Sequence, residues 1–239
     1  MRTSLGFADH HAFDYPWLAL TAVSLVSLVR TAATHRQKLA GVVGLAFGVS
    51  GQTLAWEAGP LLIAPIGLIV AILAVLWVFQ HESPVRNGAP IVVGLGVAGA
   101  LTWVVHSSLG WHTALVAGSP LLLTVGAVGV LAVAELINRL YLSASVAAIA
   151  ELIIGGLGLV AFRSMFPEFW ATTVTRVTQT LLRTDAIAET KTLFGDSVAW
   201  LLLFGFILIL ALPYLVWATW EQRRDLRWTV PVGYGWALF

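Results

Sequence analysis

The sequence predicts an all-α protein, a polytopic membrane helical bundle of about eight spans with the last one incomplete. Hydrophobic residues make up 59% of the 239 residues and charged residues only 10%, and the mean hydropathy is +0.88. A soluble fold could not cover that much apolar surface. The apolar residues also gather in long runs, and the basic residues fall in alternate connections between those runs.

Seven apolar runs approach the roughly twenty residues that a spanning helix needs, and an eighth begins near Trp228. The seven runs are residues 15–29, 39–56, 61–79, 90–106, 114–137, 142–162 and 198–217. Four glycines thin out the second run, and Pro65 is a candidate kink in the third. We therefore expect an outer loop over 1–14, about six spans over 15–162, a long outer loop over 163–197, and a span, a cytoplasmic loop and a truncated span over 198–239.

The orientation of the bundle follows from its basic connections. If every run spans, the connections after the first, third, fifth and seventh runs lie on one side, which the positive-inside rule makes cytoplasmic. Their basic residues are Arg30, Arg36, Lys38, Arg86, Arg139, Arg223, Arg224 and Arg227. The N-terminal segment and the 163–197 loop then face outward. The predicted location is the cell membrane.

Composition also excludes other classes. The net charge is +1 and no basic cluster alternates with aromatic residues, so no nucleic-acid partner is expected. The absence of cysteine excludes disulfides and thiolate metal sites. The first residues carry Asp9, His10, His11 and Asp14 in place of a basic segment with a small-residue cleavage site, so we expect no secretory signal peptide.

A glycine-rich string inside the fourth run, Gly94-Leu95-Gly96-Val97-Ala98-Gly99, matches a nucleotide-binding pattern. It has no strand before it and lies within an apolar run, so close helix packing through small residues is the better interpretation.

Two acids and two histidines lie in or near the apolar runs. Acids inside a membrane are functional candidates by default. Glu135 is close to the cytoplasmic end and four residues before Arg139, so we expect the two to pair, whereas the role of the deeper Glu151 stays open. His106 and His112 flank the outer end of the fourth run and are expected to be interfacial.

The long connection over 163–197 carries an amphipathic stretch. Over residues 169–182, apolar side chains recur at helical spacing between polar ones, which predicts an interfacial helix on the outer surface. The string Ala186-Ile187-Ala188-Glu189 follows it. Connections of this length in compact membrane proteins are usually functional or disordered.

The N-terminal string Gly6-Phe7-Ala8-Asp9-His10-His11 is the candidate site. An acid and a histidine two positions later can offer a carboxylate oxygen and an imidazole nitrogen to one divalent metal if the backbone is extended or turned. An unengaged juxtamembrane cluster is the alternative, because such triplets are common by chance.

The N-terminal string Gly6–His11 and the later string Ala186–Glu189 are predicted to lie on the same side of the membrane. In this order they resemble the catalytic subunit of oligosaccharyltransferase, in particular its archaeal form, AglB. That family carries a D-x-H motif within a G-[FY]-x-D-H-H string, and a T-I-x-E motif six spans later. Gly6–His11 resembles the first, and Ala186, Ile187, Ala188 and Glu189 resemble the second. The resemblance covers the middle of the family's transmembrane domain, which has the glycosyltransferase fold called GT-C.

The resemblance implies a metal-dependent enzyme of protein N-glycosylation. It would transfer an oligosaccharide from a dolichol-linked (pyro)phosphate donor to the asparagine of Asn-x-Ser/Thr in an acceptor polypeptide, at the outer membrane surface. Asp9 and His11 would hold manganese or magnesium (Mn²⁺ or Mg²⁺), which neutralises the leaving pyrophosphate. Glu189 would bind the acceptor amide. Asp9 and Glu189 are therefore expected to approach one external cavity.

The chain departs from the family's pattern, and rival functions stay open. Ala186 lacks the hydroxyl of the family's threonine, the family's first outer-loop acid would precede Met1, and its W-W-D-Y-G motif is absent. By the predicted topology Arg223 and Arg224 are cytoplasmic and would not hold the lipid pyrophosphate. The alternatives are an inactive truncated or degenerate copy, a polytopic transporter, and a related glycosyltransferase with another acceptor.

Overall fold

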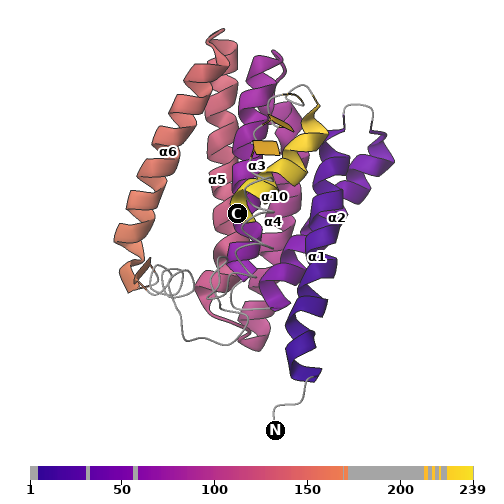
Figure 1. Cartoon of the computed structure of the whole chain (residues 1–239). Helices are drawn as coiled ribbons and strands as arrows, with labels where there is room; N and C mark the ends of the chain where they lie inside the picture. Colours follow the sequence, from indigo (N-terminus) through magenta and orange to yellow (C-terminus); the bar gives the residue numbers. More distant parts are fainter. Residues whose placement is uncertain are drawn as a thin grey trace, which may run out of the picture. The chain divides into compact units, whose positions relative to one another are not determined.

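The computed structural model describes residues 5–30, 33–55, 59–168, 170–171, 213–214, 217–218, 221 and 225–238, and only the backbone at 5–15 and 235–238. Within these ranges the ordered elements are all helical (Figure 1). They are α1 (Leu5–Val29), α2 (His35–Ala55), α3 (Gly59–Phe79), α4 (Pro84–Leu109), α5 (Ala114–Arg139), α6 (Ala144–Met165), the 3-10 turn η3 (Leu226–Trp228) and α10 (Thr229–Leu238).

Five of these helices, α2 to α6, are long and apolar enough to cross a membrane. They contain most of the second to sixth predicted runs. The predicted all-α fold is confirmed in the described residues, and these five helices are compatible with a membrane bundle. The part of α1 from Pro16 to Val29 is a shorter apolar helix. Most of the seventh run, residues 198–217, lies outside the described residues.

The N-terminal segment differs from the prediction. The sequence predicts a loop over residues 1–14, but α1 begins at Leu5, so Gly6–His11 has helical backbone. Leu5, Ala8 and Ala12 are good helix formers, and Pro16 does not break α1, as happens in helices whose neighbours compensate for the missing hydrogen bond. The hydropathy of residues 5–14 is too low to reveal this extension.

The chain divides into two compact units. The first holds Met1–Glu151 with Glu221–Leu238, and the second holds Leu152–Trp220 with Phe239.

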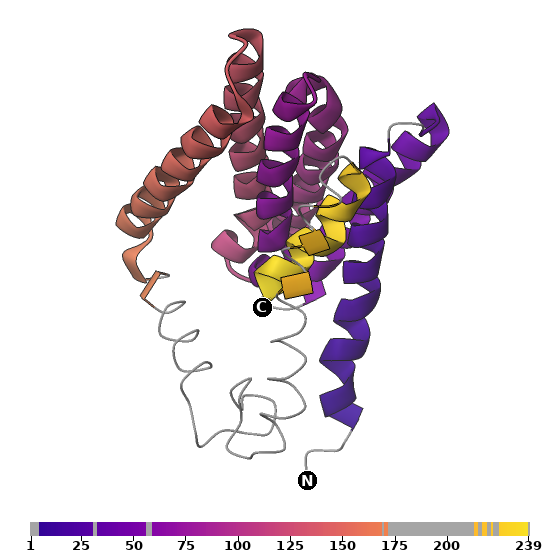
Figure 2. The same cartoon turned by 45° about the horizontal axis from the view of Figure 1, so that its top comes forward.

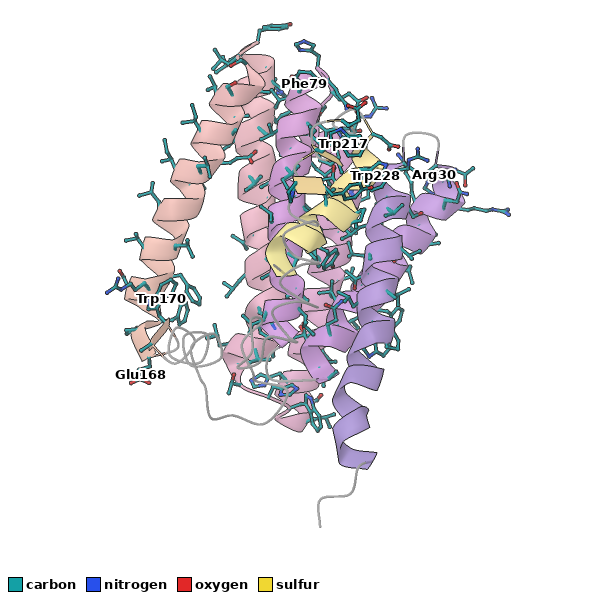
Figure 3. The ribbon with its side chains drawn as sticks, viewed as in Figure 1. Arg30, Phe79, Glu168, Trp170, Trp217 and Trp228 are labelled. Carbon is teal, nitrogen blue, oxygen red and sulfur yellow. The ribbon has the colours of Figure 1, made fainter. Side chains whose placement is uncertain are left out.

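In the first unit α1 packs on α2, α2 on α4, and both α3 and α4 on α5. Its core contains Leu25, Leu45, Ile66, Leu73 and Leu95, all fully buried. Described residues of the second unit include the part of α6 from Leu152 onward, and Glu168 and Trp170 follow that helix (Figure 3).

A stripe of glycines on α2 allows close contact with α1. The pairs are Gly41 with Leu28, Gly44 with Ser24, Gly48 with Thr21, and Gly51 with Trp17. A Cβ atom at Gly48 would meet the Thr21 side chain and would lie 3.0 Å from the Thr21 amide nitrogen and 3.1 Å from the Trp17 carbonyl oxygen. The backbones of the two helices therefore approach too closely for any larger residue, as is typical of helix pairs in membranes.

The glycine string in α4 packs in the same way. A Cβ atom at Gly94 would lie 2.9 Å from Leu45 Cδ2 on α2, and one at Gly99 would lie 2.6 Å from Leu121 Cγ on α5. The packing interpretation of this string is confirmed.

The C-terminal helix α10 is ten residues long, or about 15 Å, half of a typical hydrocarbon core. It packs on α3 and contacts α1, and Figure 2 shows it between these two helices. Val230, Val232 and Tyr234 are buried in the bundle. The sequence predicts a spanning helix beginning here, but the described residues form a short helix inside the first unit.

Candidate functional site

The predicted metal ligands Asp9 and His11 lie two residues apart on the continuous helix α1. Positions i and i+2 of a helix do not face each other, so ligation of one ion by both residues would require this turn to open. On helical backbone, the acid that shares a face with His10 and His11 is Asp14, four and three positions later. The D-x-H spacing alone does not reveal this arrangement.

The second predicted string, Ala186, Ile187, Ala188 and Glu189, lies outside the described residues, as does most of the predicted interfacial helix. The approach of Asp9 to Glu189 therefore stays a prediction. Among the residues whose side chains the structure describes, which exclude 5–15, no three histidine, aspartate or glutamate residues are grouped so that they could hold a metal.

The two histidines near the C-terminal end of α4 bind backbone carbonyl groups. His112 Nε2 lies 2.9 Å from the Leu54 carbonyl oxygen, and Trp111 Nε1 donates to the same oxygen at 2.8 Å. Because a carbonyl group only accepts, His112 carries its hydrogen on Nε2. His106 Nδ1 lies 3.1 Å from the Trp111 carbonyl oxygen. These contacts tie the α4–α5 connection to the last turn of α2 and agree with an interfacial, structural role.

At the opposite end, Glu135 of α5 holds the α3–α4 connection. Its Oε2 accepts hydrogen bonds from the Ser83 hydroxyl at 2.7 Å and from the Val85 amide at 3.4 Å. Its Oε1 accepts from Arg139 Nε at 2.9 Å, so the predicted pairing with Arg139 is confirmed. Ser83 also caps α4 by accepting from the Arg86 amide. One carboxylate therefore fixes the start of α4 against the end of α5.

Replacing Glu135 by alanine is expected to destabilise the protein by about 1–3 kcal/mol, because Ser83, Val85 and Arg139 lose their acceptor. That corresponds to a fall in melting temperature of roughly 2–12 °C for a chain of this size. Thermal unfolding in detergent measures it, and Glu168→Ala, at an exposed residue, is the matched control. An equal fall for both variants would contradict the assigned role.

A pocket of about 560 Å³ opens at this same end of the first unit. It is bordered by the ends of α1, α2, α3 and α4 and by η3. Its polar lining residues are Arg30, Lys38, His81, Glu82, Ser83, Arg86 and Asn87, and its apolar ones are Leu28, Val29, Trp77 and Leu226. Figure 3 shows Arg30, Phe79 and Trp228 toward this end of the bundle. We refer to it as the basic pocket.

The basic pocket confirms that the basic connections converge. Arg30 and Lys38 belong to the connection after the first run and Arg86 to the connection after the third, and all three line one cavity. Arg139 lies at the same end, because it pairs with Glu135 and Glu135 accepts a hydrogen bond from the lining residue Ser83. Arg227 follows the lining residue Leu226 in the sequence. These basic residues therefore lie at one end of the first unit.

The acids near the basic pocket are engaged. Glu82 Oε2 accepts a hydrogen bond from Asn87 Nδ2 at 2.6 Å, and the backbone carbonyl of Glu82 accepts from Asn138. Arg227 donates through Nε and Nη2 to the two oxygens of Asp225. These hydrogen bonds hold the pKa of the Asp225 carboxyl below its usual value.

Two buried polar side chains lie in the span-length helices, away from the basic pocket. Gln52 of α2 is fully buried and donates to Thr21 Oγ1 at 2.6 Å and to the Trp17 carbonyl at 3.2 Å. Gln52 Oε1 and Glu151 Oε1 are buried and have no hydrogen-bond partner among the described residues. Gln52 was not predicted from the sequence, although an amide side chain inside an apolar run can indicate a hydrogen bond between helices.

No family model, curated protein or solved structure matches this chain.

Proposed function

We propose that this chain is part of the membrane domain of an oligosaccharyltransferase-type enzyme. The proposed reaction is transfer of an oligosaccharide from a dolichol-linked donor to the asparagine of Asn-x-Ser/Thr in an acceptor polypeptide. The bundle of span-length helices supports the proposal at the level of architecture. The resemblance carried by Gly6–His11 and by Ala186–Glu189 supplies the reaction class.

The direction of α1 is the observation that supports the proposed site most directly. Its last residue, Val29, lines the basic pocket, and Asp9 lies twenty residues earlier, about 30 Å along the helix. Asp9 is therefore at the opposite end of α1 from the basic connections. If the basic end is cytoplasmic, this is the outer surface, where the proposed reaction takes place.

The proposed roles follow from the chemistry of the residues. The Glu189 carboxylate would accept hydrogen bonds from the acceptor amide and orient its nitrogen toward the sugar carbon. A bound Mn²⁺ or Mg²⁺ would supply positive charge for the leaving pyrophosphate. The helical backbone at Asp9 and His11 does not suit joint ligation, so the metal site would form only if this turn opens.

Reconstituted full-length chain tests the proposal. The assay supplies a dolichol-linked oligosaccharide, a fluorescent Asn-x-Thr peptide and Mn²⁺, and follows the mass of the peptide. We expect transfer of the oligosaccharide to the peptide, and we expect a chelator to abolish it. Asp9→Asn, His11→Ala and Glu189→Gln should each abolish it as well. Glu168→Gln is the control for Glu189, and a peptide with glutamine in place of asparagine is the control for the acceptor.

Other outcomes lead to other functions. Transfer lost with Asp14→Asn but kept with Asp9→Asn would contradict the D-x-H assignment and favour the helical face of Asp14. If the chain folds but transfers no oligosaccharide in any condition, the result would favour the alternative of an inactive copy.

A transporter is the second candidate, and buried Glu151 and Gln52 are the observation that favours it. Acids inside membrane helices often mark proton and ion pathways. Solute or proton flux in the same vesicles, abolished by Glu151→Gln, would support this function in place of the transferase.

A further inference from the structure

We propose that the basic pocket binds the phosphate group of an anionic ligand, and that this ligand is a phospholipid headgroup. The inference concerns the end of the bundle opposite to Asp9 and does not depend on the proposed transferase activity.

The charge of the basic pocket favours an anion. Three cations, Arg30, Lys38 and Arg86, line it together with one carboxylate, Glu82. Among the described residues none of these three cations forms an ion pair. Glu82 is engaged by Asn87, and it offsets only one of the three positive charges. Arginine and lysine are the usual phosphate-binding side chains, through bidentate hydrogen bonds and as point charges respectively.

The neighbouring acids do not neutralise these cations. Glu135 is held by Arg139 and Ser83, and Asp225 is held by Arg227. Each of them has its own cationic partner. An incoming phosphate would therefore meet Arg30, Lys38 and Arg86 without displacing a protein carboxylate from them.

The shape of the basic pocket favours a lipid over a free ion. Its volume of about 560 Å³ exceeds what a phosphate ion alone requires and lies within the range of small-molecule sites. Its apolar lining residues, Leu28, Val29, Trp77 and Leu226, are 2–6% exposed, so they contribute little of its surface and the lining is mainly polar. A mainly polar cavity of this size with three cations in its lining matches a phosphodiester headgroup together with its glycerol.

The position of the pocket gives a lipid access to it. It lies at the ends of span-length helices, on the side that the positive-inside rule makes cytoplasmic. Basic pockets between helices on that side are known to bind anionic headgroups. The positive-inside rule alone explains basic residues in these connections, but it does not require three of them to line one cavity. Arg36, in the first turn of α2, is exposed and does not line it.

Arg36 therefore provides a matched control for a binding experiment. Purified full-length protein in zwitterionic detergent is titrated with phosphatidylglycerol, phosphatidylcholine or inorganic phosphate, and native mass spectrometry counts the bound molecules. We expect selective retention of phosphatidylglycerol. Because each basic side chain near an anionic headgroup contributes to affinity, Arg30→Gln, Lys38→Gln and Arg86→Gln should each weaken it about fivefold. Arg36→Gln should leave it unchanged.

The outcomes separate the possible ligands. Loss of phosphatidylglycerol binding in the three pocket variants alone supports the lipid. Retention of inorganic phosphate but not of phosphatidylglycerol, lost in the same variants, supports the phosphate chemistry and overturns the lipid. Equal weakening by Arg36→Gln, or equal binding of phosphatidylcholine, overturns the site altogether. The melting temperature of each variant without added lipid shows that the fold is intact.

Discussion

Replacing Gly48 by leucine is expected to disrupt the pairing of α1 with α2. Gly48 lies against Thr21 and the Trp17 carbonyl, and a Cβ atom would contact backbone atoms there at 3.0–3.1 Å. Backbone cannot move aside as a flexible side chain can, so the helices would have to separate. Overpacking of a tight site costs about 1–3 kcal/mol and occasionally more, and we expect the upper end here. The melting temperature should fall by roughly 6–12 °C.

Gly129→Leu is the matched control for Gly48→Leu. Gly129 also lies inside a span-length helix, α5, but among the described residues no atom outside its own stretch of helix lies within 4 Å of a Cβ atom at that position. The same change in size should therefore alter the free energy of unfolding by no more than about 0.5 kcal/mol. Thermal unfolding and size-exclusion chromatography in one detergent compare the two variants. Similar losses would show that leucine is harmful in these helices for reasons other than contact with α1.

The contrast follows from how helices associate in lipid. Lipid tails are as apolar as leucine, so burial of apolar surface does not drive helices together, and close packing and hydrogen bonds must do so. The Gly41–Gly51 stripe provides the first, and the bonds from Gln52 to Thr21 and Trp17 provide the second. Close packing and hydrogen bonds therefore both hold α1 and α2 together.

Local signals predicted the helices and some of their contacts. Hydropathy alone located most of α2 to α6, because each span must be long and apolar by itself. The pairing of Glu135 with Arg139 followed from their four-residue spacing on one helix. The alternation of basic connections followed from counting spans.

Contacts between distant segments could not be predicted in this way. The bond from Ser83 to Glu135 joins residues 52 positions apart, and the basic pocket depends on how α1, α2, α4 and η3 pack. The helical backbone at Asp9 was missed because residues 5–14 are too polar for a hydropathy signal. The burial of α10 against α3 was missed because its apolar residues resemble the start of another span.

Replacing Trp77 by alanine is the second change with a large expected effect. Trp77 is the largest fully buried side chain described and is 2% exposed at the end of α3. It supports the wall of the basic pocket and belongs to the core of the first unit. Removing the indole ring would leave a cavity that helices joined by short connections cannot fill, so we expect a loss of about 3–5 kcal/mol.

Trp103→Ala in α4 is the matched control, because that tryptophan is 43% exposed and its described ring contact is with His106. It should cost much less in a thermal unfolding experiment, and Trp77→Phe should fall between the two, since a smaller ring fills part of the space. If the free energy of unfolding fell equally for Trp77→Ala and Trp103→Ala, Trp77 would not be part of a packed core. The lining residues around Trp77 would then lack the support of a packed core.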